Sequence, residues 1–447
     1  MSQPKLIIIG AGPKAMAIAA KATVLRDLGC AVPEIHIIER TVVGANWTGT
    51  AGYTNGRQPL GTSPEKDVGF PYGSTCWGAD LSPTVNHGMM RFSWQSFLVD
   101  QGQLAEWIDR GRPAPEHRQW AQYLQWVAAL VHDMQATARG PHVHIHHGEV
   151  TGISLAGDRW TVSYRSADAV TDLQGDGLVV TGPGQALVPA AWALGERVMT
   201  VETFWQQFGT FQALEPARFA IVGSGETAAA VALGLLQGVR QHHEIDIISP
   251  MGMAYTRGEG FRENRMYSDP AQGSWHLLTP QHRRDFIYRT DRSVFSQHAQ
   301  KQLDHTAGVE IVPGRLQEVA TTPDGQTELT IEYAEQRSTH RYDYVVLATG
   351  ADHMHRFDRL IDDATRTSLL AQTGLAALTA ESVEPTIQYD LSMRGLLPAL
   401  HLPMLAAMSQ GPGFPNLSCL GLMADRILEP YVGLPATLSQ ATSAAVA

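Results

Sequence analysis

The chain has 447 residues, of which 44% are hydrophobic, so it can bury a large core and is long enough for two or three domains. Its formal net charge of −11 argues against a nucleic acid or an anionic membrane surface as the main partner. Cys30, Cys76 and Cys419 lie far apart in sequence, so we expect free thiols in a cytoplasmic protein. We expect no signal peptide, because the few polar residues before the strand at Leu6 leave no room for a charged n-region and a cleavage site. We expect no membrane insertion, because no apolar run reaches the length of a spanning helix.

A glycine-rich turn lies near the start of the chain, between an expected strand at residues 5–9 and an expected helix at residues 13–28. Gly10 allows the tight bend, Gly12 lets the backbone approach a pyrophosphate, and Ala15 lets the helix pack closely on the strand. The pyrophosphate would lie at the positive N-terminus of the helix. This pattern predicts a dinucleotide-binding unit.

The same arrangement occurs a second time, between an expected strand at residues 219–222 and an expected helix at residues 226–238. Gly223 and Gly225 take the positions of the first two glycines, and Thr227 lies in the first helical turn. One such turn is weak evidence, because an ordinary strand-to-helix turn can match it. Two turns in the same context predict two dinucleotide sites.

The residue that ends the second strand of each unit indicates which dinucleotide binds there. Glu39 offers a carboxylate that can accept both hydrogen bonds from an adenosine ribose and would repel a 2′-phosphate, so FAD or NAD(H) suits the first site. Ser249 holds the equivalent position in the second unit and is uncharged, so NADPH suits that site, with NADH as an alternative. Arg257 is our candidate for contact with the 2′-phosphate, together with Arg262 and Arg265.

These elements predict an α/β fold with two Rossmann-like dinucleotide-binding domains, the second inserted into the first, and a smaller helical substrate region. We expect residues 1–190 to form the first part of the FAD-binding domain and residues 195–320 the NAD(P)H-binding domain. Residues 321–432 would return to the FAD domain and supply the substrate-binding region, and residues 433–447 would be a flexible tail. The long irregular stretch at residues 42–91 is a candidate binding loop.

Three histidines alternate along one expected strand, so His142, His144 and His146 share a face. Imidazoles in such an arrangement can bind a metal. No carboxylate or cysteine accompanies them at ligand spacing in the sequence. We therefore expect an exposed strand face and no metal site.

Several longer segments are more specific than the glycine-rich turns. Together they resemble the flavin-dependent N-hydroxylating monooxygenases that act on L-lysine or L-ornithine in siderophore assembly. The resemblance is strongest to the lysine N6-hydroxylases of the mycobactin and nocobactin type, and it covers nearly the whole chain. The segments that carry it are Leu6–Ala15, Leu60–Tyr72, Glu106–Pro113, Thr256–Phe261 and Gln410–Leu420.

The resemblance implies roles for residues that the motifs alone do not single out. Trp47 and Arg118 match positions that line the flavin site of the family. Lys66 matches the lysine that binds the substrate carboxylate, within a stretch similar to the family's S-x-x-K-D. Asn264 matches an asparagine that contacts the amino-acid backbone, and Ser418 matches a serine of the same pocket.

The chain departs from the family pattern at three positions. Gly61 stands where the family often has a glutamine on the flavin face, and Ala351 stands where a tyrosine ends the D-x-x-x-L-A-T-G-Y stretch. Asp291 replaces an asparagine of the substrate loop in ornithine enzymes. An acidic group there could pair with a longer ammonium, which favours lysine over ornithine.

The function that the resemblance implies is FAD- and NAD(P)H-dependent hydroxylation of L-lysine by O2 to N6-hydroxylysine, through a C4a-hydroperoxyflavin. Such an enzyme would be cytoplasmic and a homo-oligomer. Two alternatives stay open: an L-ornithine N5-hydroxylase or other class B flavin monooxygenase, and a degenerate flavoprotein with only NAD(P)H oxidase or binding activity. A disulfide reductase is disfavoured, because it needs a redox-active cysteine pair.

Overall fold

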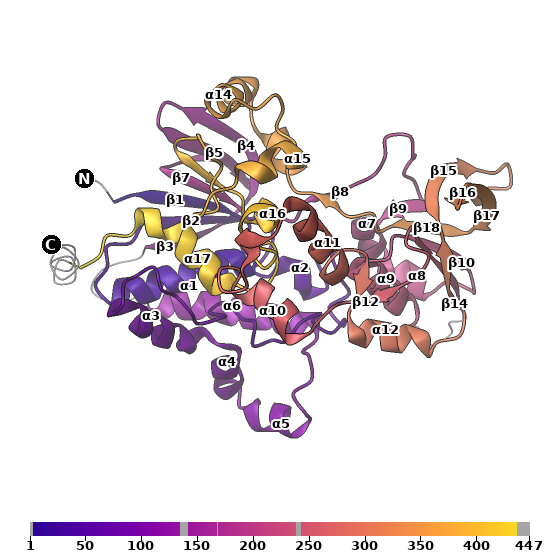
Figure 1. Cartoon of the computed structure of the whole chain (residues 1–447), viewed down its shortest axis with the longest axis horizontal. Helices are drawn as coiled ribbons and strands as arrows, with labels where there is room; N and C mark the ends of the chain where they lie inside the picture. The colour runs from indigo at the N-terminus through magenta and orange to yellow at the C-terminus, as the bar shows by residue number, and fades with distance from the viewer. Residues whose placement is uncertain (1–2, 135–141, 168, 238–242, 436–447) are drawn as a thin grey trace.

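The computed structural model describes residues 3–134, 142–167, 169–237 and 243–435. Two five-stranded parallel sheets occupy different parts of the molecule (Figure 1). Among the described residues, no helix is long and apolar enough to cross a membrane. The prediction of two Rossmann-like units is confirmed.

The first sheet has the strand order β20-β7-β1-β2-β3. Its central strand is apolar and fully buried at Leu6, Ile7 and Ile8, as expected for a parallel sheet covered on both faces. The helices α1, α6 and α17 lie on one face, and a three-stranded antiparallel sheet covers the other (Figure 1). The strands are β1 (Lys5–Ile9), β2 (Glu34–Glu39), β3 (Val143–His147), β7 (Gly177–Val180) and β20 (Ala399–His401), and the covering elements are α1 (Pro13–Asp27), α6 (His117–Met134), α17 (Leu420–Leu428), β4 (Glu149–Ala156), β5 (Arg159–Ser166) and β6 (Ala169–Gly175).

The second sheet has the strand order β14-β11-β10-β18-β9, and its chain lies between β7 and β20 of the first sheet. The second unit is therefore inserted into the first, as predicted. Its elements are β9 (Val198–Thr200), α7 (Val201–Gln206), α8 (Phe208–Gln212), β10 (Arg218–Val222), α9 (Glu226–Leu235), β11 (Glu244–Ser249), α12 (Gln297–Asp304), β14 (Val309–Pro313), β15 (Arg315–Thr321), β16 (Thr327–Tyr333), β17 (Gln336–Tyr342) and β18 (Tyr344–Leu347).

The boundary of the second domain differs from the expected one. Strand β18 pairs with β10 and β9, so the second domain extends to Leu347 rather than ending at residue 320. The antiparallel sheet β15–β17 separates β14 from β18 in the chain, and its local pattern does not reveal which sheet the next strand joins. At the other end, Gly433 pairs with Ala31, and residues 436–447 of the expected tail lie outside the described residues.

The chain crosses from one sheet to the other twice, and the two connecting segments lie side by side. Strand β8 (Gln185–Ala186) pairs in antiparallel fashion with β19 (Ala351–Asp352). Three helices lie between the two sheets: α10 (Phe261–Ser268), α11 (Pro280–Thr290) and α16 (Ala407–Gln410) (Figure 1). The remaining elements are α2 (Ala45–Thr48), α3 (Leu81–Met89), α4 (Trp94–Asp100), α5 (Leu104–Asp109), β12 (Tyr255–Thr256), β13 (Val294–Phe295), α13 (His355–Leu360), α14 (Asp363–Thr373) and α15 (Ala380–Val383).

Candidate active site between two dinucleotide cavities

A cavity of about 770 Å³ opens at the carboxyl ends of β1 and β2. Gly10, Gly12, Glu39 and Trp47, four of the residues that we assigned to cofactor binding, line it. A Cβ atom added at Gly12 would meet nothing within 4 Å, so the backbone there is open to a close ligand. Ala15 does not line the cavity; it is fully buried in α1, where a small residue lets the helix pack on the sheet. The turn fits a pyrophosphate.

The carboxylate of Glu39 is held at the end of β2 by the backbone around it. Its Oε2 accepts a hydrogen bond from the N–H of Ala11 at 2.8 Å, and its Oε1 accepts from the N–H of Thr41 at 2.9 Å. Oε1 also accepts from the Thr41 hydroxyl at 3.0 Å, which occupies both of its lone pairs, whereas Oε2 keeps a lone pair that can accept from a ribose hydroxyl. This arrangement fits the predicted role in FAD binding.

We expected Arg118 to line the first cavity, but other basic residues do. Arg118 does not line the cavity; 58% of its side chain is exposed, and its Nε lies 2.6 Å from Glu116. Lys14, Arg40 and other basic residues line the cavity instead. Lys14 donates to the carbonyl of Pro415 at 2.6 Å, and burial lowers its pKa to about 8. The signal for Lys14 in the sequence is a lysine in the first helical turn, directly after the glycine-rich turn.

A second cavity, of about 1650 Å³, lies at the equivalent edge of the second sheet. Gly223, Gly225 and Thr227, which we assigned to the second dinucleotide, line it. Ser249 does not: it is fully buried, and its hydroxyl lies 2.8 Å from the carbonyl oxygen of Met253. Ser249 therefore shapes the loop after β11 in this structure, and other residues face the ligand space.

The basic residues of the second cavity also differ from those that we expected. Arg257 is not among its lining residues; it donates to the carbonyl of Gly61 at 3.0 Å and lies 3.6 Å from Glu226. Arg315 lines the cavity, just after β14. The preceding Gly314 donates its N–H to the carbonyl of Ser249 at 2.9 Å, so the structure places Arg315 beside the end of β11. This is where an NADPH-binding domain needs a cation.

Lys66 and Asn264 meet in space although 198 positions separate them. The Lys66 Nζ donates to the Asn264 Oδ1 at 3.2 Å, and the Asn264 Nδ2 donates to the carbonyl of Glu259 at 2.8 Å. Burial lowers the pKa of Lys66, the nearby Arg257 lowers it further, and Glu259 opposes both effects. A partly buried ammonium beside an amide is suited to bind a carboxylate of a small molecule.

The loop that presents Lys66 is anchored by its neighbour. Asp67 is fully buried and accepts hydrogen bonds from the Tyr72 hydroxyl at 2.7 Å and the Trp94 N–H at 2.8 Å. Burial raises the pKa of Asp67 to about 7, although these hydrogen bonds lower it. We assigned no role to Asp67 from the sequence, where it is visible only as the last residue of the S-x-x-K-D stretch.

Ser418 lies in the segment that connects the first cavity with α10. It is buried, and its N–H donates to the Asn416 Oδ1 at 2.9 Å. Asn416 lines the first cavity. A Cβ atom added at Gly413 would lie 1.9 Å from the carbonyl oxygen of Tyr267 in α10, so this segment crosses that helix in backbone contact. The crossing places the segment that contains Ser418 next to α10, the helix that carries Asn264.

Asp291 lies on a different wall. It follows α11 and lines the second cavity, and 41% of its side chain is exposed. Among the described residues it makes no hydrogen bond or ion pair with Lys66 or Asn264. Desolvation raises its pKa, while Arg292 and Arg257 oppose the shift. Asp291 is therefore separate from the Lys66–Asn264 pair.

Two dinucleotide cavities in an inserted pair of Rossmann-like domains, with a polar site between them, define an NAD(P)H-dependent flavoprotein. The chain belongs to the L-lysine 6-monooxygenase/L-ornithine 5-monooxygenase family, whose model matches residues 78–353.

Individual relatives agree with this assignment. The chain is 42% identical to the L-lysine N6-monooxygenase MbtG of Mycobacterium tuberculosis, over 97% of this chain and 96% of that protein. It is similar to the solved structure of the lysine monooxygenase NbtG from Nocardia farcinica, with a TM-score of 0.80, 41% identity, and coverage of 95% of this chain and 98% of that one. The ornithine N-hydroxylase KtzI of Kutzneria sp. 744 shares the fold at a TM-score of 0.71 and 18% identity, with coverage of 96% and 99%.

Proposed function

We propose that the chain is an FAD- and NADPH-dependent monooxygenase that uses O2 to hydroxylate the side-chain amine of L-lysine, giving N6-hydroxylysine for siderophore biosynthesis. The observation that carries the proposal is the Lys66–Asn264 pair, in a chain 42% identical to an L-lysine N6-monooxygenase over 97% of its length. We further expect a cytoplasmic homo-oligomer.

The residues of the two cavities fit the two cofactors. FAD would be held by the turn at Gly10 and Gly12, with Glu39 at its ribose and Trp47 on the cavity wall. NADPH would be held by the turn at Gly223, Gly225 and Thr227, with Arg315 at its 2′-phosphate. When bound, these cofactors supply the hydride transfer and oxygen activation, so the chain needs no nucleophile of its own.

The chain's own task is to bind and orient the amino acid. The Lys66 ammonium would bind the α-carboxylate of lysine, and the amide of Asn264 would hydrogen-bond with its α-amino group. Ser418 would complete this end of the pocket. With the amino-acid end held, the side-chain amine is directed away from Lys66, which is how a positioned substrate gains effective concentration at a reacting centre.

The side-chain amine must lose its proton before it can act as a nucleophile. The reference pKa of a lysine amine is about 10.4, so the amine is charged at neutral pH in water. Desolvation favours the neutral form. We propose that exclusion of water around the amine performs this step.

Asp291 is our candidate for discrimination between lysine and ornithine. Its place on the wall of the second cavity supports a contact with the far end of a longer side chain, directly or through a water molecule. An ionised carboxylate against the amine would favour the charged amine and so oppose its reaction. Asp291→Asn should therefore change the ratio of kcat/KM for lysine to that for ornithine more than it changes NADPH oxidation without substrate.

Product analysis tests the proposed function directly. The FAD-loaded protein is incubated with NADPH, O2 and one of lysine, ornithine or an N6-acyl-lysine, and the products are identified by mass spectrometry. We expect one added oxygen on free lysine. If ornithine is hydroxylated in preference to lysine, ornithine is the substrate. If NADPH is oxidised at the same rate with and without every amine, the chain is a degenerate flavoprotein that hydroxylates none of them.

A further inference from the structure

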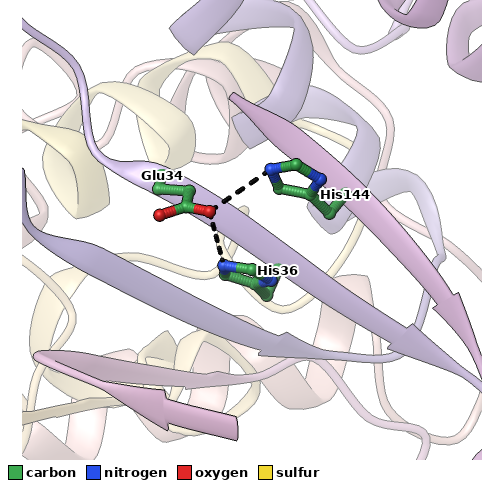
Figure 2. Close-up of side chains that lie close together, drawn as sticks. All are labelled: Glu34, His36 and His144. Atoms are coloured by element: carbon green, nitrogen blue, oxygen red, sulfur yellow. Dashed lines mark ion pairs between the residues drawn. The ribbon is translucent and has the colours of Figure 1, made fainter. Parts of the chain in front are cut away.

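A cluster of ligand-type side chains lies at the amino-terminal ends of β2 and β3, at the opposite end of β2 from Glu39. The sheet register pairs His36 with His144, and Glu34 precedes His36 by two positions, so the three side chains share one face. Figure 2 shows both imidazoles directed toward the Glu34 carboxylate. We expected no carboxylate beside the histidine run; the neighbouring strand supplies one.

The distances in this cluster match those between ligands of a metal ion. The Glu34 Oε1 lies 3.2 Å from the His36 Nε2 and 3.4 Å from the His144 Nε2. All three ligand atoms lie within 4.8 Å of one another. In a tetrahedral zinc site, bonds of about 2.0–2.1 Å place neighbouring ligand atoms about 3.3 Å apart. Small side-chain movements would bring all three into one coordination sphere.

The hydrogen bonds around His36 leave its Nε2 available. This atom is buried and has no hydrogen-bond partner among the described residues, although Glu34 is close. The His36 Nδ1 lies 2.9 Å from the His146 Nε2, and the His146 Nδ1 lies 3.3 Å from the Tyr164 hydroxyl. If the His36 Nδ1–H donates to His146, the Nε2 presents a lone pair to the site. Metal-ligating histidines commonly use their second nitrogen in this way.

We propose that Glu34, His36 and His144 form a binding site for a divalent transition-metal ion of the Zn²⁺ type, apart from the cofactor cavities. Two imidazoles and one carboxylate suit Zn²⁺ and related ions, whereas Mg²⁺ and Ca²⁺ prefer oxygen ligands alone. Glu34 would bind through Oε1, because its Oε2 lies 3.4 Å from the Lys5 Nζ. Water would complete the coordination.

Calorimetric titration of the FAD-loaded enzyme with Zn²⁺ tests the site, with the visible absorption of bound Co²⁺ as a second measurement. His144→Asn and Glu34→Gln remove ligands that are partly exposed, and His147→Asn replaces an exposed histidine of the same strand as a control. We expect one equivalent of Zn²⁺ in the wild type and in His147→Asn, and affinity at least ~10-fold weaker in each ligand variant. Unchanged lysine hydroxylation would show that the variants are folded.

Three results would overturn the proposal. The first is the absence of stoichiometric Zn²⁺ binding by the wild-type enzyme. The second is equal Zn²⁺ affinity in the wild type and both ligand variants. The third is competition by Mg²⁺ as effective as that by Co²⁺, because a site with two imidazoles should discriminate strongly between these ions.

Discussion

Lys21 in α1 and Asp425 in α17 form an ion pair of 2.7 Å in which only 1% and 4% of the two side chains are exposed. The same carboxylate accepts hydrogen bonds from the Trp77 indole and the Ser74 hydroxyl. The pair joins the helix that follows the first glycine-rich turn to the helix that follows Ser418. It therefore ties α1, whose first turn borders the first cavity, to α17, which begins just after Ser418.

Lys21→Met should destabilise the protein strongly, because Asp425 would remain buried without its cation. Loss of one partner of a buried pair costs about 3–5 kcal/mol in the free energy of unfolding. Arg91→Ala is the control, since Arg91 and Asp27 form a largely exposed pair worth less than about 1 kcal/mol. Urea unfolding compares the two variants, and equal losses would contradict the structural role of the buried pair.

Lys66→Ala should raise the KM for lysine without abolishing NADPH oxidation in the absence of lysine. Loss of a charge-assisted hydrogen bond of about 1.5–3 kcal/mol corresponds to roughly 10- to 150-fold in KM. Asn264→Ala should act in the same direction with a smaller effect, since a neutral group is lost. Steady-state kinetics measure both, with the exposed Lys301→Ala as a control. If the KM for lysine is the same in Lys66→Ala as in the wild type, Lys66 is not part of the substrate site.

Glu39→Gln should weaken FAD binding at least ~10-fold. A glutamine side chain would direct its NH2 group at one of the backbone N–H groups of Ala11 and Thr41, which now donate to the carboxylate. Equilibrium dialysis with FAD measures the change. Glu149→Gln is a matched control on the same cavity wall, and a comparable loss there would mean that net charge rather than the hydrogen bonds of Glu39 holds the ribose.

The predictions from sequence succeeded where the determinants are local. The first glycine-rich turn and Glu39 belong to one βαβ unit, β1-α1-β2, so their arrangement follows from the geometry of that unit. The choice of Lys66 and Asn264 came from the family resemblance, because no spacing rule relates residues 198 positions apart. Their contact in the structure is consistent with that choice.

The sequence could not reveal which cations face the cavities, because this depends on strand order. Arg315 reaches the second cavity since β14 pairs with β11, a neighbour that the chain order does not predict. Arg257 was the nearer candidate in sequence but contacts Gly61. Ser249 follows the expected strand, yet the fold of the next loop buries it. Nonlocal packing decided each of these outcomes.

Arg315→Ala should raise the KM for NADPH about 10-fold and leave the KM for NADH nearly unchanged. The guanidinium would lose a charge-assisted contact with a phosphate that only NADPH carries. Steady-state oxidation of NADPH and of NADH at varied cofactor concentration gives both KM values. The matched control is Arg337→Ala, an exposed arginine of the same antiparallel sheet that pairs with Glu332. Equal effects on NADPH and NADH would argue against a contact with the 2′-phosphate.

Because of Asp67, the free energy of unfolding should fall as the pH rises from about 4 to about 7. Burial raises its pKa from 3.8 to about 7 in the folded chain, so in this window the folded state binds a proton that the unfolded state has released. The stabilisation is complete below pH 4 and is lost as the pH passes 7. Asp67→Asn is neutral throughout, so the wild type should lose stability relative to it as the pH rises. The free energy of unfolding in urea is measured at several pH values for both proteins. If it changes with pH in the same way in the wild type and in Asp67→Asn, the raised pKa is not that of Asp67.

The antiparallel pairing of β8 with β19 has a consequence for the ancestry of the chain. The Leu187 N–H donates to the carbonyl of Gly350 at 3.0 Å, so the entrance to the second domain and the exit from it are adjacent. A gene segment encoding residues 188–349 could have entered an existing flavin-binding gene at a single surface loop without changing the path of the first sheet. By the same geometry, a short linker from Leu187 to Gly350 would close the parent domain again.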